Sequence, residues 1–248
     1  MATPEVSFLP LTCGFVPEHF RTKAETQLGE SEESAAEGLR KLREFLKNEN
    51  YPPNDDDTFL LQFLRQQKFN ERNAEKKLKQ HYSMRGKTSE LYQNIDLETV
   101  RSIMDSKVVG LFPFRDAEGR TIVYTNSNAV DLERFKASDL FKCTLALFHF
   151  ACSFPLTAVA GLNLVGEASY PKVNDAFKIF KEAMNFVWIQ LHFHGSSMDF
   201  VHKVYHPSIL PNEFGGTMGP LNNDSYMEGF LEYTKKLKAE CHLYNKLC

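Results

Sequence analysis

The sequence is poor in cysteine and tryptophan, and it carries no excess of basic residues. Its five cysteines are odd in number and include no CxxC pair, which is typical of reduced thiols in a cytoplasmic protein and argues against a disulfide framework. Acidic residues outnumber Lys and Arg by 32 to 29, for a net charge of −3. A nucleic-acid partner is therefore not expected.

Sequence motifs of the common catalytic sites are also missing. The chain contains no nucleophile elbow, P-loop, glycine-rich dinucleotide loop or zincin helix, so we expect neither an enzyme nor a bound cofactor. The best metal candidate is LHFHG, where His192 and His194 project to the same side of a predicted strand. A zinc site needs further ligands, and His202 and His206 are the nearest histidines in sequence. We favour hydrogen-bonded histidines without metal, and a metal-dependent hydrolase stays the alternative.

Long uncharged stretches are scarce, and one of them has the length of a membrane span. Residues 143–166 contain no Asp, Glu, Lys or Arg, and a stretch of this length suffices to cross a bilayer. Because His149, Pro155 and Asn163 interrupt it, we favour a buried helix that runs through a turn into a buried strand. The first residues lack the positive charges of a signal peptide, and we expect a cytoplasmic protein.

Phenylalanine, with 21 copies, is the residue that the chain has in excess. It suits an extensive core or the wall of an apolar cavity. After a polar extension over residues 1–30, helical patterns cover residues 31–90, and acidic residues follow Ser31 as they do at a helix start. The first helix has a basic face, interpreted as solvated rather than as a lipid-docking surface, which consists of Arg40, Arg43 and Lys47.

Two further helices follow in this helical region. Residues 55–57 offer N-cap oxygens for one of them, and Asn70 offers the cap of the other. In the second helix, Ala74, Leu78 and Tyr82 recur at helical spacing and form the predicted inner stripe. The rest of that helix is strongly charged, so we expect it to face water.

Beyond residue 95, helices and strands alternate, which favours an α/β layer over an all-helical domain. The segments KVVGLFPF and RTIVY flank the turn DAEG and predict a hairpin over residues 107–124. The elements expected after it are a helix at 132–150, a buried strand at 158–165, a helix at 173–188, a strand at 190–194, a helix at 197–205 and a terminal amphipathic helix at 224–245.

The segment LPNEFGGT, residues 210–217, places two consecutive glycines after an aromatic residue. Glycine adopts positive φ without the steric cost of a Cβ atom. We therefore predict a tight turn with Phe214 packed underneath it.

Four segments, in register, resemble the CRAL-TRIO (Sec14-like) lipid-binding proteins, in the branch of the tocopherol-transfer and retinaldehyde-binding proteins. FLLQFLRQQKFNERNAEKKLKQHYSMR resembles the N-terminal helical region of that family, and GLFPFRDAEGRTIVY resembles the first hairpin of its lipid-binding domain. SFPLTAVAGLNLV is similar to the strand after a Phe-Pro-Leu turn, and the segment from LHFHG to ILPNEFGGT resembles the closing signature. The chain is identified as a member of this family.

The resemblance implies an α/β fold: an N-terminal helical domain at 31–90, a lipid-binding domain at 95–222 whose central β-sheet is flanked by helices, and a C-terminal helix at 223–248. It also implies a monomer that binds a small hydrophobic lipid, such as a tocopherol, retinoid or phosphoinositide, and transfers it between membranes without catalysis. A mobile lid helix at 173–188 would close an apolar cavity. The implied cavity and lid residues are Phe148, Leu162, Leu164, Phe177, Phe180, Met184, Val187 and Trp188.

Two departures from the family pattern stand out. A strand and a helix that normally precede the SFPL turn in the family are absent. The neighbouring strands would then be left with unpaired backbone groups, and each such buried group costs about 1–3 kcal/mol. Either the sheet re-pairs around a smaller cavity, or the domain is unstable. The cations with which some relatives hold a phosphoinositide are absent after SFPL and before LHFHG. The alternative is a family member that binds no lipid and acts through protein or membrane-surface interaction.

Overall fold

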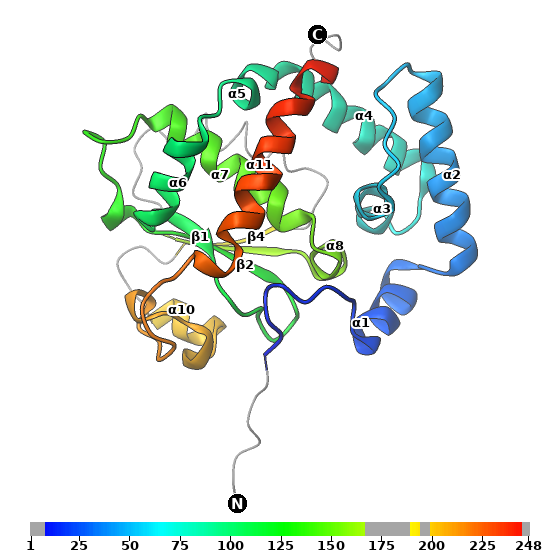
Figure 1. Cartoon of the computed structure of the whole chain (residues 1–248). Coiled ribbons are helices and arrows are strands. Elements are labelled where there is room, and N and C mark those ends of the chain that lie inside the picture. The colour runs from blue at the N-terminus through cyan, green and yellow to red at the C-terminus, as the bar shows by residue number, and fades with distance from the viewer. Residues whose placement is uncertain (1–7, 167–188, 194–198, 245–248) are drawn as a thin grey trace, which may run out of the picture.

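The computed structural model describes residues 8–166, 189–193 and 199–244, and shows a mostly helical α/β protein built on a small mixed sheet (Figure 1). The sheet has the order β1-β2-β3-β4. The first pair of strands is antiparallel and the other two pairs are parallel. The strands are β1 (Val109–Leu111), β2 (Thr121–Thr125), β3 (Leu162–Gly166) and β4 (Ile189–Phe193).

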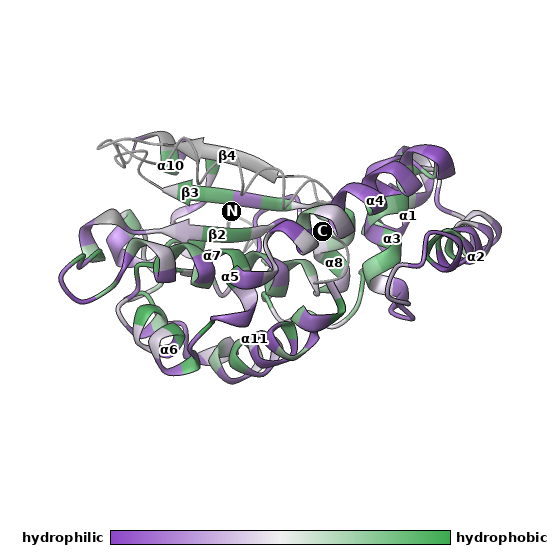
Figure 2. Cartoon of the chain, turned by 90° about the horizontal axis from the view of Figure 1, so that it is seen from above, coloured by the Kyte–Doolittle hydropathy of each residue, from purple (hydrophilic) through white to green (hydrophobic). Residues whose placement is uncertain are grey.

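Four N-terminal helices lie beside one end of the sheet rather than on it (Figures 1 and 2). The predicted helix starts are confirmed, because the side chains of Ser31, Asp56 and Asn70 accept backbone N–H bonds at the three N-caps. The structure adds a short helix and a π-helical turn, Ala24–Leu28, within the predicted polar extension. The four helices are α1 (Glu18–Lys23), α2 (Glu32–Asn48), α3 (Asp57–Gln66) and α4 (Glu71–Lys87).

Helices cover both faces of the sheet (Figure 1). One face carries α5 (Ser89–Gln93), α6 (Leu97–Asp105), α7 (Ala137–Cys152) and α11 (Asp224–Tyr244), and the other carries α10 (Asp199–Val204) with the 3-10 turns at Pro207–Ile209 and Asn212–Phe214. The short helix α8 (Pro155–Ala160) packs against the first N-terminal helical segment in a separate apolar cluster. Successive strand residues point to opposite faces. Leu164 accordingly belongs to the core under α7, and Val165 belongs to the core under α10.

The uncharged stretch 143–166 forms the second half of α7, the short helix α8 and the buried strand β3, which confirms its interpretation as core rather than as a membrane span. The expected strand at 158–165 is partly wrong, because α8 continues to Ala160 and β3 begins only at Leu162. Pro155 occupies the first turn of α8, where its missing N–H costs nothing, and Gly161 leaves the helix with a φ of 91°. Among the described helices, none is long and apolar enough to cross a bilayer.

The strands β2 and β3 are neighbours in the sheet, across the connection from which the sequence predicted a strand and a helix to be lacking. β2 pairs in parallel with β3 over five residues, from Thr121 opposite Leu162 to Thr125 opposite Gly166. The crossover between them consists of α7 and α8, and β3 is apolar over most of its length (Figure 2). The two strands thus pair directly with each other, as the re-pairing expectation requires.

Candidate functional site

The predicted wall residues that the structure describes lie together in one packed core. Phe148 on α7 and Leu162 on β3 are fully buried, and Leu164 on β3 is 7% exposed. All three belong to the same apolar cluster as residues of α6 and α11. The other five predicted residues lie outside the described part of the chain: Phe177, Phe180, Met184, Val187 and Trp188.

The histidines considered for a metal site have other roles where they are described. His202 Nε2 lies 3.1 Å from the carbonyl oxygen of Phe214, and His206 Nδ1 lies 2.8 Å from the Ser208 hydroxyl. The side chains of His192 and His194 are outside the described residues. Within the described ranges, no three His, Cys, Asp or Glu side chains are grouped as a metal site requires.

The LPNEFGGT segment is a structural turn, as predicted. Phe214 is buried beneath it and packs edge-on against Phe112, with ring centroids 5.3 Å apart. Gly215 has a φ of 71°. At Gly216 a Cβ atom would lie 1.9 Å from the carbonyl oxygen of Leu210, so the chain can fold back this closely only without a side chain.

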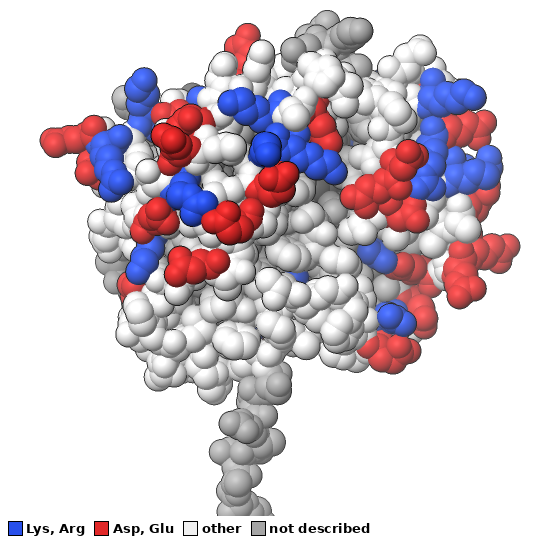
Figure 3. Space-filling model, in the orientation of Figure 1, with Lys and Arg blue, Asp and Glu red and all other residues white. Residues whose placement is uncertain are grey.

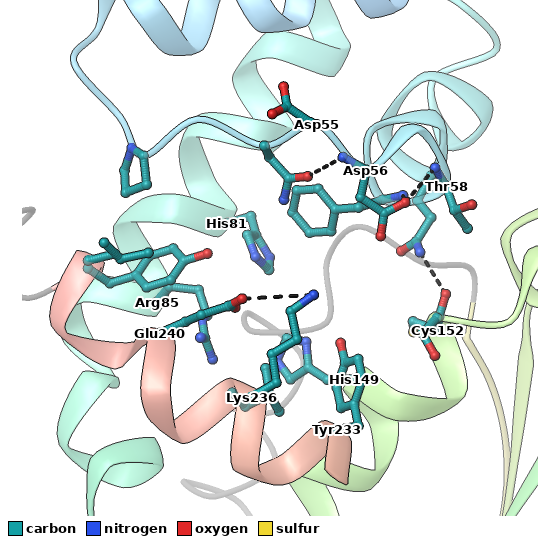
Figure 4. A pocket seen from close by; sticks show the side chains of 18 of the residues that line it. Asp55, Asp56, Thr58, His81, Arg85, His149, Cys152, Tyr233, Lys236 and Glu240 are labelled. Carbon is teal, nitrogen blue, oxygen red and sulfur yellow. Dashed lines mark hydrogen bonds and ion pairs between the residues drawn. The ribbon is translucent and has the colours of Figure 1, made fainter. Parts of the chain in front are cut away.

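A cavity of about 290 Å³ lies where the N-terminal helices meet α7 and α11 (Figure 4). It is close to the small end of the range for ligand pockets, about 300–1,000 Å³. Both charged and aromatic side chains line this interhelical cavity. Its lining includes Asp55, Asp56, Phe59, Gln62, His81, Arg85, His149, Cys152, Tyr233, Lys236, Leu237, Glu240 and Tyr244.

Arg85 is the buried cation of this cavity. It is 4% exposed, and its guanidinium carbon lies 4.0 Å from the ring centroid of Tyr92 and 4.5 Å from that of Tyr244. Its Nη1 atom is buried and has no hydrogen-bond partner. Two aromatic faces thus stabilise the charge by cation–π interaction, while at least one donor is unused.

Two buried histidines flank Arg85. Burial, with a smaller contribution from the nearby guanidinium, lowers the pKa of His81 to about 3. Burial likewise lowers the pKa of His149 well below its ordinary value, with contributions from Arg85 and His81. Both imidazoles are therefore neutral at physiological pH, and His149 Nε2 lies 2.9 Å from the Tyr92 hydroxyl.

Acidic side chains occupy the outer part of the same cavity. Asp55 and Asp56 are exposed and belong to the loop that leads into α3, and Glu240 projects from α11 toward Lys236 (Figure 4). Lys236 Nζ lies 3.9 Å from Glu240 Oε1. The buried part of the cavity therefore carries the Arg85 cation, and the outer part carries Asp55, Asp56 and the Lys236–Glu240 pair.

The sequence did not predict this cavity. His81 and Arg85 lie on α4, in the part that we expected to face water, and both are buried. A signal was present: His81 follows Leu78 by three positions and Arg85 follows Tyr82 by three, so both share the inner stripe of that helix. Because both residues are polar, the sequence pattern did not indicate that they belong to the buried stripe.

Two of the three residues that define the basic face of α2 form ion pairs with carboxylates. Arg40 forms ion pairs with Glu37 at 2.8 Å and with Glu44 at 3.0 Å. Arg43 pairs with Asp57. Figure 3 shows acidic and basic side chains intermixed over the helices, so this face presents no continuous cationic surface.

Comparison with known proteins identifies distant relatives. No family model matches the chain. Clavesin-1 of Pongo abelii is 23% identical over 265 residues, which cover 89% of the chain and 74% of the relative. Clavesin-1 of Xenopus laevis is 24% identical over 71% of the chain and 65% of the relative. Human clavesin-2 is 22% identical over 90% of the chain and 81% of the relative.

The aligned spans are longer than the part of the chain that they cover. The 265-residue span exceeds the 248 residues of the whole chain, although it covers only 89% of that chain. The 274-residue span with clavesin-2 does so as well. The relatives therefore contain residues within the aligned span that have no counterpart in this chain.

Proposed function

Because the chain is a distant homologue of the clavesins, which are CRAL-TRIO (Sec14-like) domain proteins of the α-tocopherol transfer protein-like branch, we propose that it binds a small hydrophobic lipid and carries it between membranes. The family is a non-enzymatic lipid-binding family. The observation that carries the proposal is homology that extends over about nine tenths of the chain with two different clavesins. The protein would act as a cytoplasmic monomer that docks transiently on membranes.

In this proposal the segment 173–188 is the lid. Phe177, Phe180 and Met184, with Val187 and Trp188, provide most of the contact with the lipid. Each CH₂ group that the lipid buries contributes about 0.8 kcal/mol, so an apolar enclosure can extract a chain from a bilayer. The β3 and α7 residues then form the floor beneath the lipid.

Native mass spectrometry of protein purified from a eukaryotic host, without added ligand, tests the proposal. We expect a compact ion that carries a discrete lipid mass. Phe177→Asp and Phe180→Asp place a charge in the apolar enclosure and should each abolish that adduct. Phe15→Asp is the matched control, because Phe15 is 61% exposed, and it should retain the lipid. Unchanged adducts in both lid variants would overturn the lid assignment.

A second candidate function rests on the packed state of the sheet. Phe148, Leu162 and Leu164 are buried against neighbouring side chains, and the relatives contain residues that this chain lacks. Both observations favour a family member that binds no lipid and acts through protein or membrane-surface interaction. A compact ion that stays free of adduct after incubation with a mixed lipid extract would select this function over lipid transfer.

A further inference from the structure

The interhelical cavity holds a buried cation, Arg85, that has no carboxylate partner among the described residues. Its Nη1 atom is a buried donor without a partner. Removing a charge from water costs several kcal/mol unless an opposite charge and hydrogen bonds compensate. The flanking Tyr92 and Tyr244 rings compensate only in part. An anionic group in the cavity would complete the site.

The size and the charge distribution of the cavity narrow the choice of anion. About 290 Å³ accommodates a group of headgroup size and excludes a whole lipid. Asp55 and Asp56 line the same space, together with Glu240, which pairs with Lys236 at 3.9 Å. The carboxylates outnumber the cations of this lining, so they repel an anion with several charges, such as a polyphosphate. They attract a positive group, and the aromatic side chains of Phe59 and Tyr233 on the lining also favour a quaternary ammonium.

We propose that the interhelical cavity binds a zwitterionic phosphate ester of the phosphocholine or phosphoethanolamine type, with its phosphate at Arg85 and its ammonium group toward Asp55, Asp56 and Glu240. The guanidinium suits a phosphate because its unpartnered Nη1 atom can donate a charge-assisted hydrogen bond to a phosphate oxygen. His81 and His149 lie beside Arg85 and, being neutral, add no further charge to this end of the cavity. This site is separate from the proposed lipid cavity, and it does not depend on lipid transfer.

Calorimetric titration of the intact protein with phosphocholine tests the proposal. We expect saturable binding that Arg85→Met weakens about tenfold or more, because a charge-assisted hydrogen bond is lost. Arg101→Met is the matched control, since Arg101 is an exposed arginine of α6 paired with Glu228 at 2.7 Å, and it should bind as the parent protein does. Equal affinity in Arg85→Met, or no binding by the parent protein, overturns the proposal.

Two further measurements do not depend on how well Arg85→Met folds. Glycerol 3-phosphate, which lacks the ammonium group, should bind the parent protein several-fold more weakly than phosphocholine. The double variant Asp55→Asn, Glu240→Gln should remove that preference while retaining phosphate binding. Glycerol 3-phosphate that binds as tightly as phosphocholine would overturn the proposed orientation.

Flotation with phosphatidylcholine vesicles identifies the source of the headgroup. Vesicle binding that phosphocholine displaces, and that Arg85→Met loses, supports the proposal with a lipid headgroup as ligand. Binding of soluble phosphocholine without vesicle binding supports it with a free phosphate ester as ligand. Vesicle binding that Arg85→Met retains, together with no response to soluble phosphocholine, contradicts it.

Discussion

At the scale of single residues, the unusual feature of the chain is a row of polar side chains buried on one face of α4. His81 packs against the rings of Phe59 and Phe63 with centroids 5.3 and 5.6 Å apart, and Arg85 follows one turn later between two tyrosine rings. A histidine in such surroundings is neutral, since charging it means desolvating a second cation beside the first. Stability must therefore depend on pH.

We expect the free energy of unfolding to fall as the pH is lowered below about 6.5. The ordinary histidine pKa is 6.5 and that of folded His81 is about 3, so between these values the unfolded chain binds a proton that the folded chain does not. Unfolding then takes up protons, and acid favours it. His81 should contribute a loss of about 1.4 kcal/mol between roughly pH 7.5 and 5.5, and the lowered pKa of buried His149 should add a loss in the same direction. Urea denaturation at the two pH values measures it.

His81→Phe provides the control for this pH dependence. Phenylalanine keeps the aromatic packing and does not titrate, so the variant should lose the part of the difference that His81 contributes, about 1.4 kcal/mol. His242→Phe alters an exposed histidine near the end of α11 and should leave the difference unchanged. If His81→Phe has the same pH dependence as the parent protein, His81 is not the neutral buried group that the structure indicates.

At the scale of elements, the LPNEFGGT turn contacts several elements on the α10 face of the sheet. The Glu213 carboxylate accepts a hydrogen bond from the backbone N–H of Leu221 at 2.9 Å. The Phe214 ring packs against Phe112, which directly follows β1, and against Tyr124 in β2. The Phe214 carbonyl oxygen also lies within hydrogen-bond distance of His202 on α10. The turn therefore connects a helix, a hairpin and the approach to α11.

Gly216→Ala should destabilise the protein by ~1–3 kcal/mol, because the new methyl group would collide with the Leu210 carbonyl and force the turn open. Gly14→Ala is the matched control: Gly14 is exposed and nothing lies within 4 Å of its added Cβ, so its effect should stay within about 0.5 kcal/mol. Chemical denaturation of both variants measures the difference. Equal stabilities would show that the turn yields without cost.

At the scale of the whole molecule, the question is whether the face of the sheet under α7 and α11 is a packed core or borders a cavity. Leu162 is fully buried among apolar side chains. A packed leucine that is shortened to alanine costs ~2–5 kcal/mol, whereas the cost is smaller where the side chain already borders empty space. The stability of the lipid-free protein therefore distinguishes the two arrangements.

Leu162→Ala should lower the free energy of unfolding of lipid-free protein by ~2–5 kcal/mol. Leu132→Ala is the matched control, because Leu132 is 64% exposed, and its effect should be within about 0.5 kcal/mol. A loss below about 1 kcal/mol in Leu162→Ala would contradict a packed core at β3 and point to an open space beside it.

Local interactions explain most of what the sequence by itself determined. Ser31, Asp56 and Asn70 start helices because their side chains reach N–H groups within three residues, and the hairpin and the glycine turn follow from equally local geometry. The end of α8 was not predicted correctly, because apolar residues at 158–160 suit a buried helix as well as a buried strand.

Only the tertiary structure decided what depends on contacts between distant segments. The direct pairing of β2 with β3 requires that α7 and α8 span the crossover, and no local pattern specifies it. The burial of Arg85 arises because Tyr92 and Tyr244, 7 and 159 positions away along the chain, enclose it. A charged side chain is expected in water until its neighbours are known. For this reason the family resemblance was visible in the sequence, whereas the interhelical cavity was not.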